Sequence, residues 1–477
     1  MDNNIYNNPL ITRYASTQMC QTFSEKKRIT QFRKLWLALA ESEKELGINI
    51  TKAQIDSMKE HLEDIDFDVA AEQEKKVRHD VMAHVFAFGL QCPEAKPIIH
   101  LGATSCFVAD NADIIIYRDA IEILEVKLVS VMRKLADFAQ KYKSMPTLGF
   151  THLQPAQLVT VGKRACLWLQ DLYLDYQNLM FLKNSLMLRG VKGTTGTQAS
   201  FMELFDNDSD KVKKLEKLVV KKMGFEKAFA VSGQTYTRKL DYNITSVLSQ
   251  IAQSGYKFSN DMRLLQNMKE LEEPFEKNQI GSSAMAYKRN PMRSERLGSL
   301  ARYVVSLPIN TALTASTQWL ERTLDDSANR RIVMAQAFMG IDAILELYLN
   351  IVDGIVVYKK IIEKHIKAEL PFMATENILM ECVKNGGDRQ ELHEIIRKHS
   401  MLAAEQVKVY GKDNDLIKRI KADKYFSVIK DKIDAIMKPK NFIGRAPAQV
   451  NEFLATVKPL FKKYSGRLTE NSDTIKV

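Results

Sequence analysis

The stretch IIIYRDAIEILEVKLVSVMRKLADFAQKY, residues 114–142, decides the fold of this 477-residue chain. Its apolar residues recur at alternating spacings of three and four, at Ile114, Tyr117, Ile121, Leu124, Leu128, Val131, Leu135, Phe138 and Tyr142. This spacing puts them on one face of a helix and is typical of the seam of a helical bundle. No proline lies between Pro97 and Pro146, so we predict one helix of about 30 residues, about 45 Å long.

Other long segments have the same helical character. Residues 244–265 repeat the three-and-four spacing, and residues 158–188 and 328–357 have apolar helical faces. No proline lies between Pro155 and Pro274, and no series of regularly spaced alternating strands is visible. The sequence therefore predicts an all-α fold with a long central bundle. Because the stripes at 114–142 and 244–265 offer more apolar face than one chain should need, we expect an oligomer, specifically a homotetramer.

The composition is that of a folded globular protein, with 45% hydrophobic and 27% charged residues. We divide the chain into an N-terminal helical unit (1–104), a central long-helix unit (105–357) and a basic helical C-terminal unit (358–477). Lys and Arg exceed Asp and Glu by 11 overall, and the last unit alone has 24 basic and 16 acidic residues. Clustered basic charge suits either a nucleic acid or a polyanionic metabolite, so charge alone does not decide the function.

The cysteine pattern and the N-terminus indicate the compartment. The five cysteines are widely spaced and form no CxxC pair, which predicts neither a disulfide framework nor a zinc site. The N-terminus lacks a leader pattern, and no run reaches about 18 uninterrupted apolar residues. We therefore expect a reduced, cytoplasmic protein without a membrane partner.

Polar segments interrupt the predicted helices. Residues 277–293, KNQIGSSAMAYKRNPMR, combine Gly281 and Pro291 with hydroxyls, amides and lysines, which suits a loop closing over an anion or a solvated connection between helices. Residues 189–198, RGVKGTTGTQ, are glycine-rich but lack the spacing of a phosphate loop, so a flexible turn is as good an interpretation. Residues 319–331, WLERTLDDSANRR, contain three arginines. These fit either bidentate binding of a phosphate or an ordinary solvent-exposed helix end.

Two histidines lie in polar surroundings. His79 is part of VRHDVMAH, and His152 is part of the proline-bounded GFTHLQPAQ. A surface or structural role is the ordinary expectation for either. His79 and His84 stand five residues apart, which does not match the four-residue spacing of a helical metal pair, so we predict no metal.

These segments together resemble a known family. GSSAMAYKRNP at residues 281–291 is similar to the signature loop of the fumarase/aspartase superfamily, GSSxMPxKxNP, although Ala286 replaces its proline and could leave the open loop less rigid. The resemblance is strongest to the adenylosuccinate lyases of that superfamily and extends over nearly the whole chain, through RYAS (13–16), RHDVMAH (78–84), HLGATSC (100–106), GFTHLQPAQ (149–157), KGTTGTQASF (192–201), GQTYTRK (233–239), LERTLDDSANRR (320–331) and FIGRAPAQV (442–450).

The resemblance implies a fold, an assembly and an activity. The fold is a fumarase/aspartase-like bundle flanked by two smaller helical domains, and the assembly is a homotetramer whose active sites are each built from three chains. The activity is β-elimination of fumarate from adenylosuccinate, giving AMP, and from succinylaminoimidazole carboxamide ribotide, giving AICAR, in purine biosynthesis. Such a reaction needs a base, a cationic clamp and an acid. The resemblance implies no cofactor, no metal and no nucleic-acid partner.

It also implies roles for matched positions. Ser282 would be the base, His152 the general acid oriented by Glu295, and Lys288 and Asn290 would stabilise the substrate carboxylate. The phosphate would be bound by Arg13, Tyr14, Arg296, Arg322, Ser327 and Arg331. The motif Arg78, His79 and Asp80 would hold the substrate near the phosphate side. The succinyl part would be bound by Thr104, Ser105, Thr151 and Gln234.

Two other classes of function stay open at this point. A different lyase of the superfamily, such as argininosuccinate lyase or fumarase, would share the signature loop but not the phosphate residues. A helical scaffold or nucleic-acid binder would use the basic C-terminal unit and would show binding that depends steeply on salt.

Overall fold

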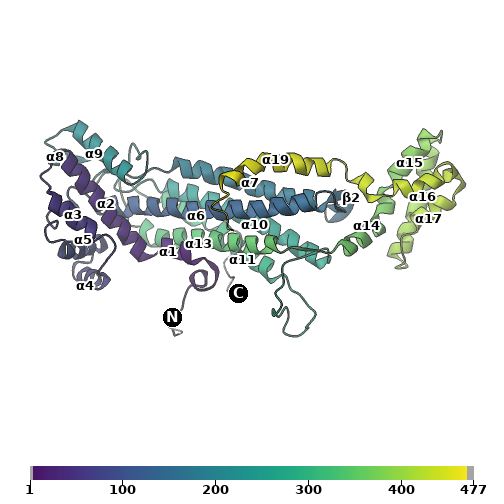
Figure 1. The fold of residues 1–477 in the computed structure, drawn as a ribbon, viewed down its shortest axis with the longest axis horizontal. Helices are drawn as coiled ribbons and strands as arrows, with labels where there is room; N and C mark the ends of the chain where they lie inside the picture. Colours follow the sequence, from purple (N-terminus) through teal and green to yellow (C-terminus); the bar gives the residue numbers. More distant parts are fainter. Residues whose placement is uncertain (1–3, 470–477) are drawn as a thin grey trace.

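The central bundle dominates the computed structural model, which describes residues 4–469 as an elongated, mainly helical molecule (Figure 1). Its long helices run along the long axis: α6 (Ser105–Lys141), α7 (Val161–Ser185), α10 (Lys239–Asn267), α11 (Met292–Ser306) and α13 (Asp326–Asp353). The short α12 (Pro308–Ser316) packs against α10 and α13. At 37 residues, α6 is longer than we predicted. The predicted all-α class with a long central bundle is confirmed.

The predicted seam of α6 is buried within this one chain. Ile114, Ile121, Leu124 and Leu128 are fully buried, and Phe138 is only 8% exposed. The helices α2, α7 and α13 of the same chain pack against α6 and cover it. Our reason for expecting an oligomer was therefore wrong, because the stripe at 114–142, like the buried stripe of α10, leaves no surplus apolar face.

Short strands take one end of each of two predicted helical segments, residues 158–188 and 328–357. Residues 154–160 form β2 (Gln154–Thr160), which pairs antiparallel with β1 (Pro146–Thr151), so α7 begins at Val161 instead of residue 158. Thr160 ends the strand and caps the helix, since its hydroxyl accepts the Lys163 amide at 3.1 Å. Likewise, α13 ends at Asp353, and β4 (Val356–Val357) pairs antiparallel with β3 (Leu271–Glu272).

Helices from the first third of the chain gather at one end of the bundle together with two later ones (Figure 1). They are α2 (Glu25–Glu45), α3 (Lys52–Glu60), α4 (Phe67–Val77), α5 (Asp80–Gln91), α8 (Ala199–Leu204) and α9 (Ser209–Lys222). The preceding η1 (Leu10–Tyr14) packs on α13, and α1 (Thr17–Thr22) contacts α6 and α13.

The C-terminal helices form a second core at the opposite end (Figure 1). Ile378, Leu392 and Phe426 lie in this core. Its elements are α15 (Thr375–Lys384), α16 (Arg389–Lys408), α17 (Leu416–Ala422), η2 (Lys424–Lys432), α18 (Ile433–Ile436) and η3 (Pro439–Phe442). The preceding α14 (Lys359–Met373) instead buries Ile362, Ile366 and Leu370 in the main core. The last helix, α19 (Ala446–Lys463), instead lies along the bundle on α6 and α7. The division at residues 104 and 357 stays a prediction.

By length and composition alone, α13 could cross a membrane. Its most apolar window is 83% buried inside the protein, as expected for a core helix.

Glu43 on α2 generates a prediction about stability. Its side chain is fully buried, and neither carboxylate oxygen has a hydrogen-bond partner within residues 4–469. Burial raises the pKa of Glu43 to about 9, so the folded protein holds a proton that the unfolded chain releases above pH 4.5. The free energy of unfolding should therefore fall as the pH rises from about 5 to about 9. Glu43→Gln should flatten this dependence in urea unfolding, whereas Glu72→Gln, at an exposed position, should leave the wild-type slope unchanged.

Candidate active site

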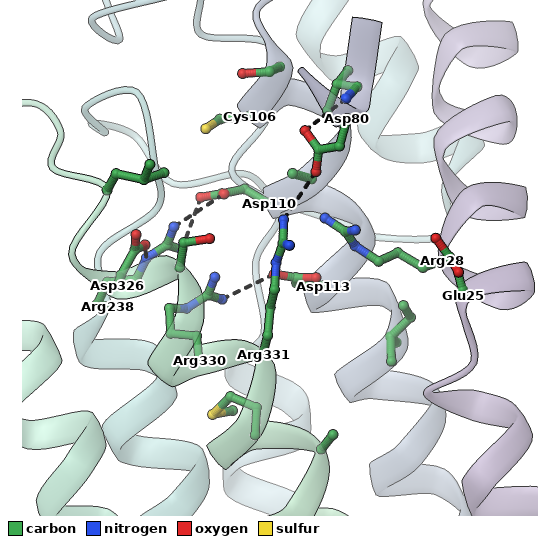
Figure 2. Close-up of a pocket in the computed structure, with 18 of the residues that line it drawn as sticks. Glu25, Arg28, Asp80, Cys106, Asp110, Asp113, Arg238, Asp326, Arg330 and Arg331 are labelled. Carbon is green, nitrogen blue, oxygen red and sulfur yellow. Dashed lines mark hydrogen bonds and ion pairs between the residues drawn. The ribbon is translucent and has the colours of Figure 1, made fainter. Parts of the chain in front are cut away.

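A pocket of about 650 Å³ lies where α6, α10 and α13 begin (Figure 2). Ser105 and Cys106 come from the first turn of α6, Arg238 from the residue before α10, and Asp326 from the first turn of α13. The N-terminal helices α2, α4 and α5 complete its walls. The pocket brings together the predicted substrate-binding residues Arg78, His79, Asp80, Ser105, Arg322, Ser327 and Arg331.

A tight turn between α4 and α5 presents the Arg78-His79-Asp80 motif. Arg78 ends α4 in the left-handed conformation, with φ 56° and ψ 36°, which reverses the chain. His79 caps α5, and its Nδ1 accepts the Met82 amide at 3.3 Å. A neutral His79 therefore carries its proton on Nε2, where it can donate to a ligand.

Asp80 links this turn to α13. One of its carboxylate oxygens accepts the Val81 amide at 2.8 Å, and the other pairs with Nη2 of Arg331 at 3.0 Å. Burial acts to raise the pKa of Asp80, but the Val81 amide and the guanidiniums of Arg28 and Arg331 outweigh it and hold the pKa below its ordinary value. Asp80 is therefore an ionised partner for the arginines of the pocket.

Arg238 ties three helix starts together behind the pocket (Figure 2). Its Nη1 lies 3.1 Å from Asp110 of α6, and its Nε lies 2.6 Å from Asp326 of α13. All three side chains are nearly inaccessible to solvent. Burial acts to lower the pKa of Arg238, but Asp110, Tyr236 and Asp241 together outweigh it and raise the pKa, so Arg238 stays charged.

Arg330 extends this network. Its Nε lies 2.5 Å from Asp241 of α10, and its Nη2 lies 3.1 Å from Asp113 of α6. The Tyr236 hydroxyl donates to Asp241 at 2.6 Å. The sequence analysis missed this network. Charged residues inside apolar helical stretches were the available signal, since charged side chains are rarely buried unless they are paired.

Arg322 faces Cys106 instead of a carboxylate. Its Nη1 lies 3.0 Å from the Cys106 sulfur. Burial raises the pKa of the Cys106 thiol to about 11, so the sulfur is a neutral thiol and no nucleophile near neutral pH. Nearby, Gln234 Nε2 donates to the Thr104 hydroxyl at 3.2 Å, which brings these two predicted residues together beside Ser105.

The loop that carries Ser282 connects β3 to α11 and projects from the bundle (Figure 1). The Ser282 hydroxyl oxygen accepts the amides of Ala284 and Met285 at 3.4 and 3.2 Å. The Asn290 side chain donates to the Gly281 carbonyl at 2.9 Å and closes the neck of the loop. A side chain at position 281 would meet the Lys288 carbonyl at 2.3 Å, so glycine is required there.

His152 lies at the tip of the β1–β2 hairpin. His152 and Leu153 form its two-residue turn with φ values of 53° and 56°, which is unusual for residues that are not glycine. The His152 side chain is exposed, as is that of Thr151 in the adjoining strand. Among the described residues, no hydrogen bond joins His152 to Glu295, which lies exposed in the first turn of α11.

The remaining predicted site residues lie far from the pocket within this chain. At 1.5 Å per residue, α6 separates Ser105 in the pocket from the hairpin of His152 by about 55 Å, and α10 separates the pocket from the Ser282 loop by about 44 Å. Arg296 lies with that loop at the start of α11. Arg13 and Tyr14 lie in η1, which packs on α13 beyond the pocket.

The glycine-rich segment 189–198 is a packed turn. The Arg189 side chain is fully buried and donates to the Gly193 carbonyl at 2.6 Å, and the Gly190 amide donates to the Asn111 side chain at 3.0 Å. Because the Arg189 side chain is buried and donates to a carbonyl of the same segment, it is not available to bind a phosphate. Within residues 4–469, no group of three or more His, Cys, Asp or Glu side chains is arranged to hold a metal ion.

Solved structures with the same fold include 3-carboxy-cis,cis-muconate lactonizing enzyme from Pseudomonas putida. It superposes with a TM-score of 0.81 at 21% identity over 95% of this chain and 99% of its own. Fumarate lyase from Mesorhizobium sp. BNC1 gives a TM-score of 0.79 at 19% identity, covering 94% and 99% of the two chains. The family profile described as Lyase matches residues 10–306. The protein is therefore an enzyme of the lyase class.

Comparison with curated protein sequences identifies the family within the lyase class. Adenylosuccinate lyases from Saccharomyces cerevisiae and Schizosaccharomyces pombe are 55% and 53% identical, each over 94% of both chains. The enzyme of the same name from Schistosoma mansoni is 50% identical over 98% of both chains. The profile described as Adenylosuccinate lyase C-terminus matches residues 371–453. The chain belongs to the adenylosuccinate lyase family.

The Arg238 network generates a prediction about folding. Arg238→Ala would leave Asp110 and Asp326 buried without their shared cation, which should lower the free energy of unfolding by about 3–5 kcal/mol. Denaturant unfolding measures this change. Arg263→Ala removes an exposed arginine from α10, the helix that follows Arg238, and should cost less than about 0.5 kcal/mol. Equal, small costs for the two variants would show that the network contributes no stability.

Proposed function

We propose that this lyase cleaves adenylosuccinate to AMP and fumarate, and that it also releases fumarate from succinylaminoimidazole carboxamide ribotide. The observation that carries the proposal is the arginine-lined pocket, in which the 78–80 motif meets the 322–331 segment. Arg322 and Ser327 supply a fork and a hydroxyl suited to a phosphate, and Ser105, with Thr104 and Gln234 beside it, can hydrogen-bond the succinyl part. A nucleotide dicarboxylate accounts for the basic charge without a nucleic acid.

Ser282 acts as the base in this proposal. It must remove a proton from the carbon beside a carboxylate, and an ordinary serine hydroxyl is a poor base. The amides of Ala284 and Met285 already point at its oxygen, so they would stabilise the negative charge of a deprotonated Ser282. Lys288, exposed in the same loop, and Asn290 would approach the substrate carboxylate when the loop closes.

His152 acts as the general acid that protonates the departing nitrogen. An imidazole side chain can carry a proton and release it to a departing nitrogen, which is why histidine commonly serves as a general acid. The left-handed backbone at the hairpin tip costs free energy, and such conformations are commonly kept at functional sites. Glu295 would orient His152 across a subunit boundary. In the same way, a substrate held by one chain would be contacted from another chain by Thr151, Arg13, Tyr14 and Arg296.

A homotetramer with shared sites follows from this assignment. One substrate cannot touch the pocket, the Ser282 loop and the hairpin of a single chain, since the rigid helices α6 and α10 separate them. The face of α7 offers an interface, because Leu167, Leu174 and Phe181 repeat every seven residues and are 43%, 52% and 78% exposed. This stripe replaces the one that we expected on α6.

We also propose a cytoplasmic location. All five cysteines lie in the described part of the chain as free thiols, and four of them are buried. Free thiols persist in a reducing compartment. The competing interpretations, another lyase of the superfamily and a helical scaffold, are not favoured by the family assignment.

The pocket assignment is tested with Arg322→Ala. Loss of a charge-assisted fork should cost about 1.5–3 kcal/mol, so kcat/KM for adenylosuccinate should fall by about 10-fold to 150-fold. Turnover is followed by the loss of succinyl-purine absorbance. The dephosphorylated nucleoside should be affected far less by the substitution. An equal loss on both substrates would assign Arg322 a structural role, and a wild-type protein inactive on adenylosuccinate would refute the function.

The shared site is tested by mixing inactive variants. Ser282→Ala and His152→Ala should each lower kcat strongly with modest effects on binding, because both groups move protons in the transition state. Ser283→Ala and His393→Ala, at neighbouring or exposed positions, serve as controls that should stay active. After subunit exchange, the two inactive variants together should regain part of the activity. Sedimentation should show a tetramer, and an active monomer would contradict shared sites.

A further inference from the structure

Arg28 is a pocket cation that the motifs did not identify. It lies half-buried near the start of α2, and its guanidinium stacks on the Phe32 ring with the carbon 4.9 Å from the ring centroid. Figure 2 shows Arg28 and Arg331 reaching into the same part of the pocket from α2 and α13. Both guanidiniums lie close enough to the carboxyl group of Asp80 to lower its pKa.

The pocket arginines differ in whether a carboxylate already neutralises them. Arg238 and Arg330 are paired with buried aspartates, and Arg331 is paired with Asp80. Within residues 4–469, Arg28 makes no ion pair, although Asp80 and Asp113 are near enough to feel its charge. Arg28 therefore has its charge and its hydrogen-bond donors available for a ligand.

We propose that Arg28 binds the substrate phosphate and forms a two-arginine clamp with Arg331. This inference rests on the proposed function, whose substrate carries the phosphate. Asp80 and Asp113 act on Arg28 from a distance, but Asp80 is paired with Arg331 and Asp113 with Arg330. A phosphate monoester, which carries about 1.5–2 negative charges near pH 7, would give Arg28 the bonded anion that neither carboxylate supplies.

The clamp would also add to specificity. The guanidinium of Arg28 is held by its stack on Phe32, so little side-chain freedom is lost when it binds. Because Arg28 comes from α2 and Arg331 from α13, a phosphate between them would join the N-terminal helices to the central bundle. A substrate without a phosphate would not bridge Arg28 and Arg331 and would therefore bind more weakly.

The test uses the full-length protein and the variants Arg28→Gln, Arg28→Lys and Lys26→Gln. Lys26 is exposed in the same first turn but does not line the pocket, so it controls for the loss of one positive charge. KM for adenylosuccinate and the inhibition constant of inorganic phosphate are measured in phosphate-free buffer. Arg28→Gln should raise both by about 10-fold to 100-fold with a smaller change in kcat. Lys26→Gln should change them by less than about threefold.

Arg28→Lys should recover part of the loss, because it keeps the charge but not the fork. The rise in melting temperature caused by inorganic phosphate should be lost in Arg28→Gln, while the melting temperature without phosphate stays at the wild-type value. Equal behaviour of Arg28→Gln and Lys26→Gln would overturn the proposal. A lower melting temperature in Arg28→Gln with an unchanged response to phosphate would also overturn it. If wild type failed to cleave adenylosuccinate but kept an Arg28-dependent response to phosphate, the proposed function would fail and the clamp would stand.

Discussion

The stiffness of α6 is the constraint on which the arrangement of the proposed site depends. Its 37 residues form one continuous helix with a buried seam from Ile114 to Phe138, held by α2, α7 and α13, so its two ends cannot approach each other. The pocket lies at its first turn, and the hairpin of His152 follows its last. A structure that brought these ends together in one chain would have to break the core that gives the helix its stability.

The arginines of the pocket fall into two groups: those at the rear are paired with carboxylates, and most of those at the front are not. Behind the pocket, Arg238 and Arg330 meet Asp110, Asp113, Asp241 and Asp326, so two cations face four carboxylates. Burial raises the pKa of Asp113, which reflects the cost of adding further negative charge there. The rear network therefore holds the helix starts in place but cannot attract an anion. Attraction comes from Arg28, Arg78 and Arg322 at the front.

Unusual backbone conformations coincide with the proposed functional residues. Arg78 and His152 both have positive φ, and neither position has the glycine that would remove the steric cost. In each case a tight reversal lets the chain present a side chain that a regular helix or strand would direct elsewhere. Gly281 shows the complementary case, since the neck of the Ser282 loop leaves no room for a side chain. Local strain and close approach thus position the groups that are proposed to react.

The sequence by itself determined the long helices, because the three-and-four spacing from Ile114 to Tyr142 permits little besides a buried helical face. It also determined most of the loop predicted at residues 277–293, since glycine and proline exclude a helix there, although α11 already begins at Met292. It singled out the motifs now lining the pocket as well. It did not predict that β2 would take residues 154–160, because a short strand and a buried helical turn have similar composition. Only the tertiary structure decided that the α6 stripe is covered by its own chain, that Arg28 joins the pocket and that four aspartates meet two arginines. Each of these depends on contacts between residues far apart in sequence, and local patterns do not encode such contacts.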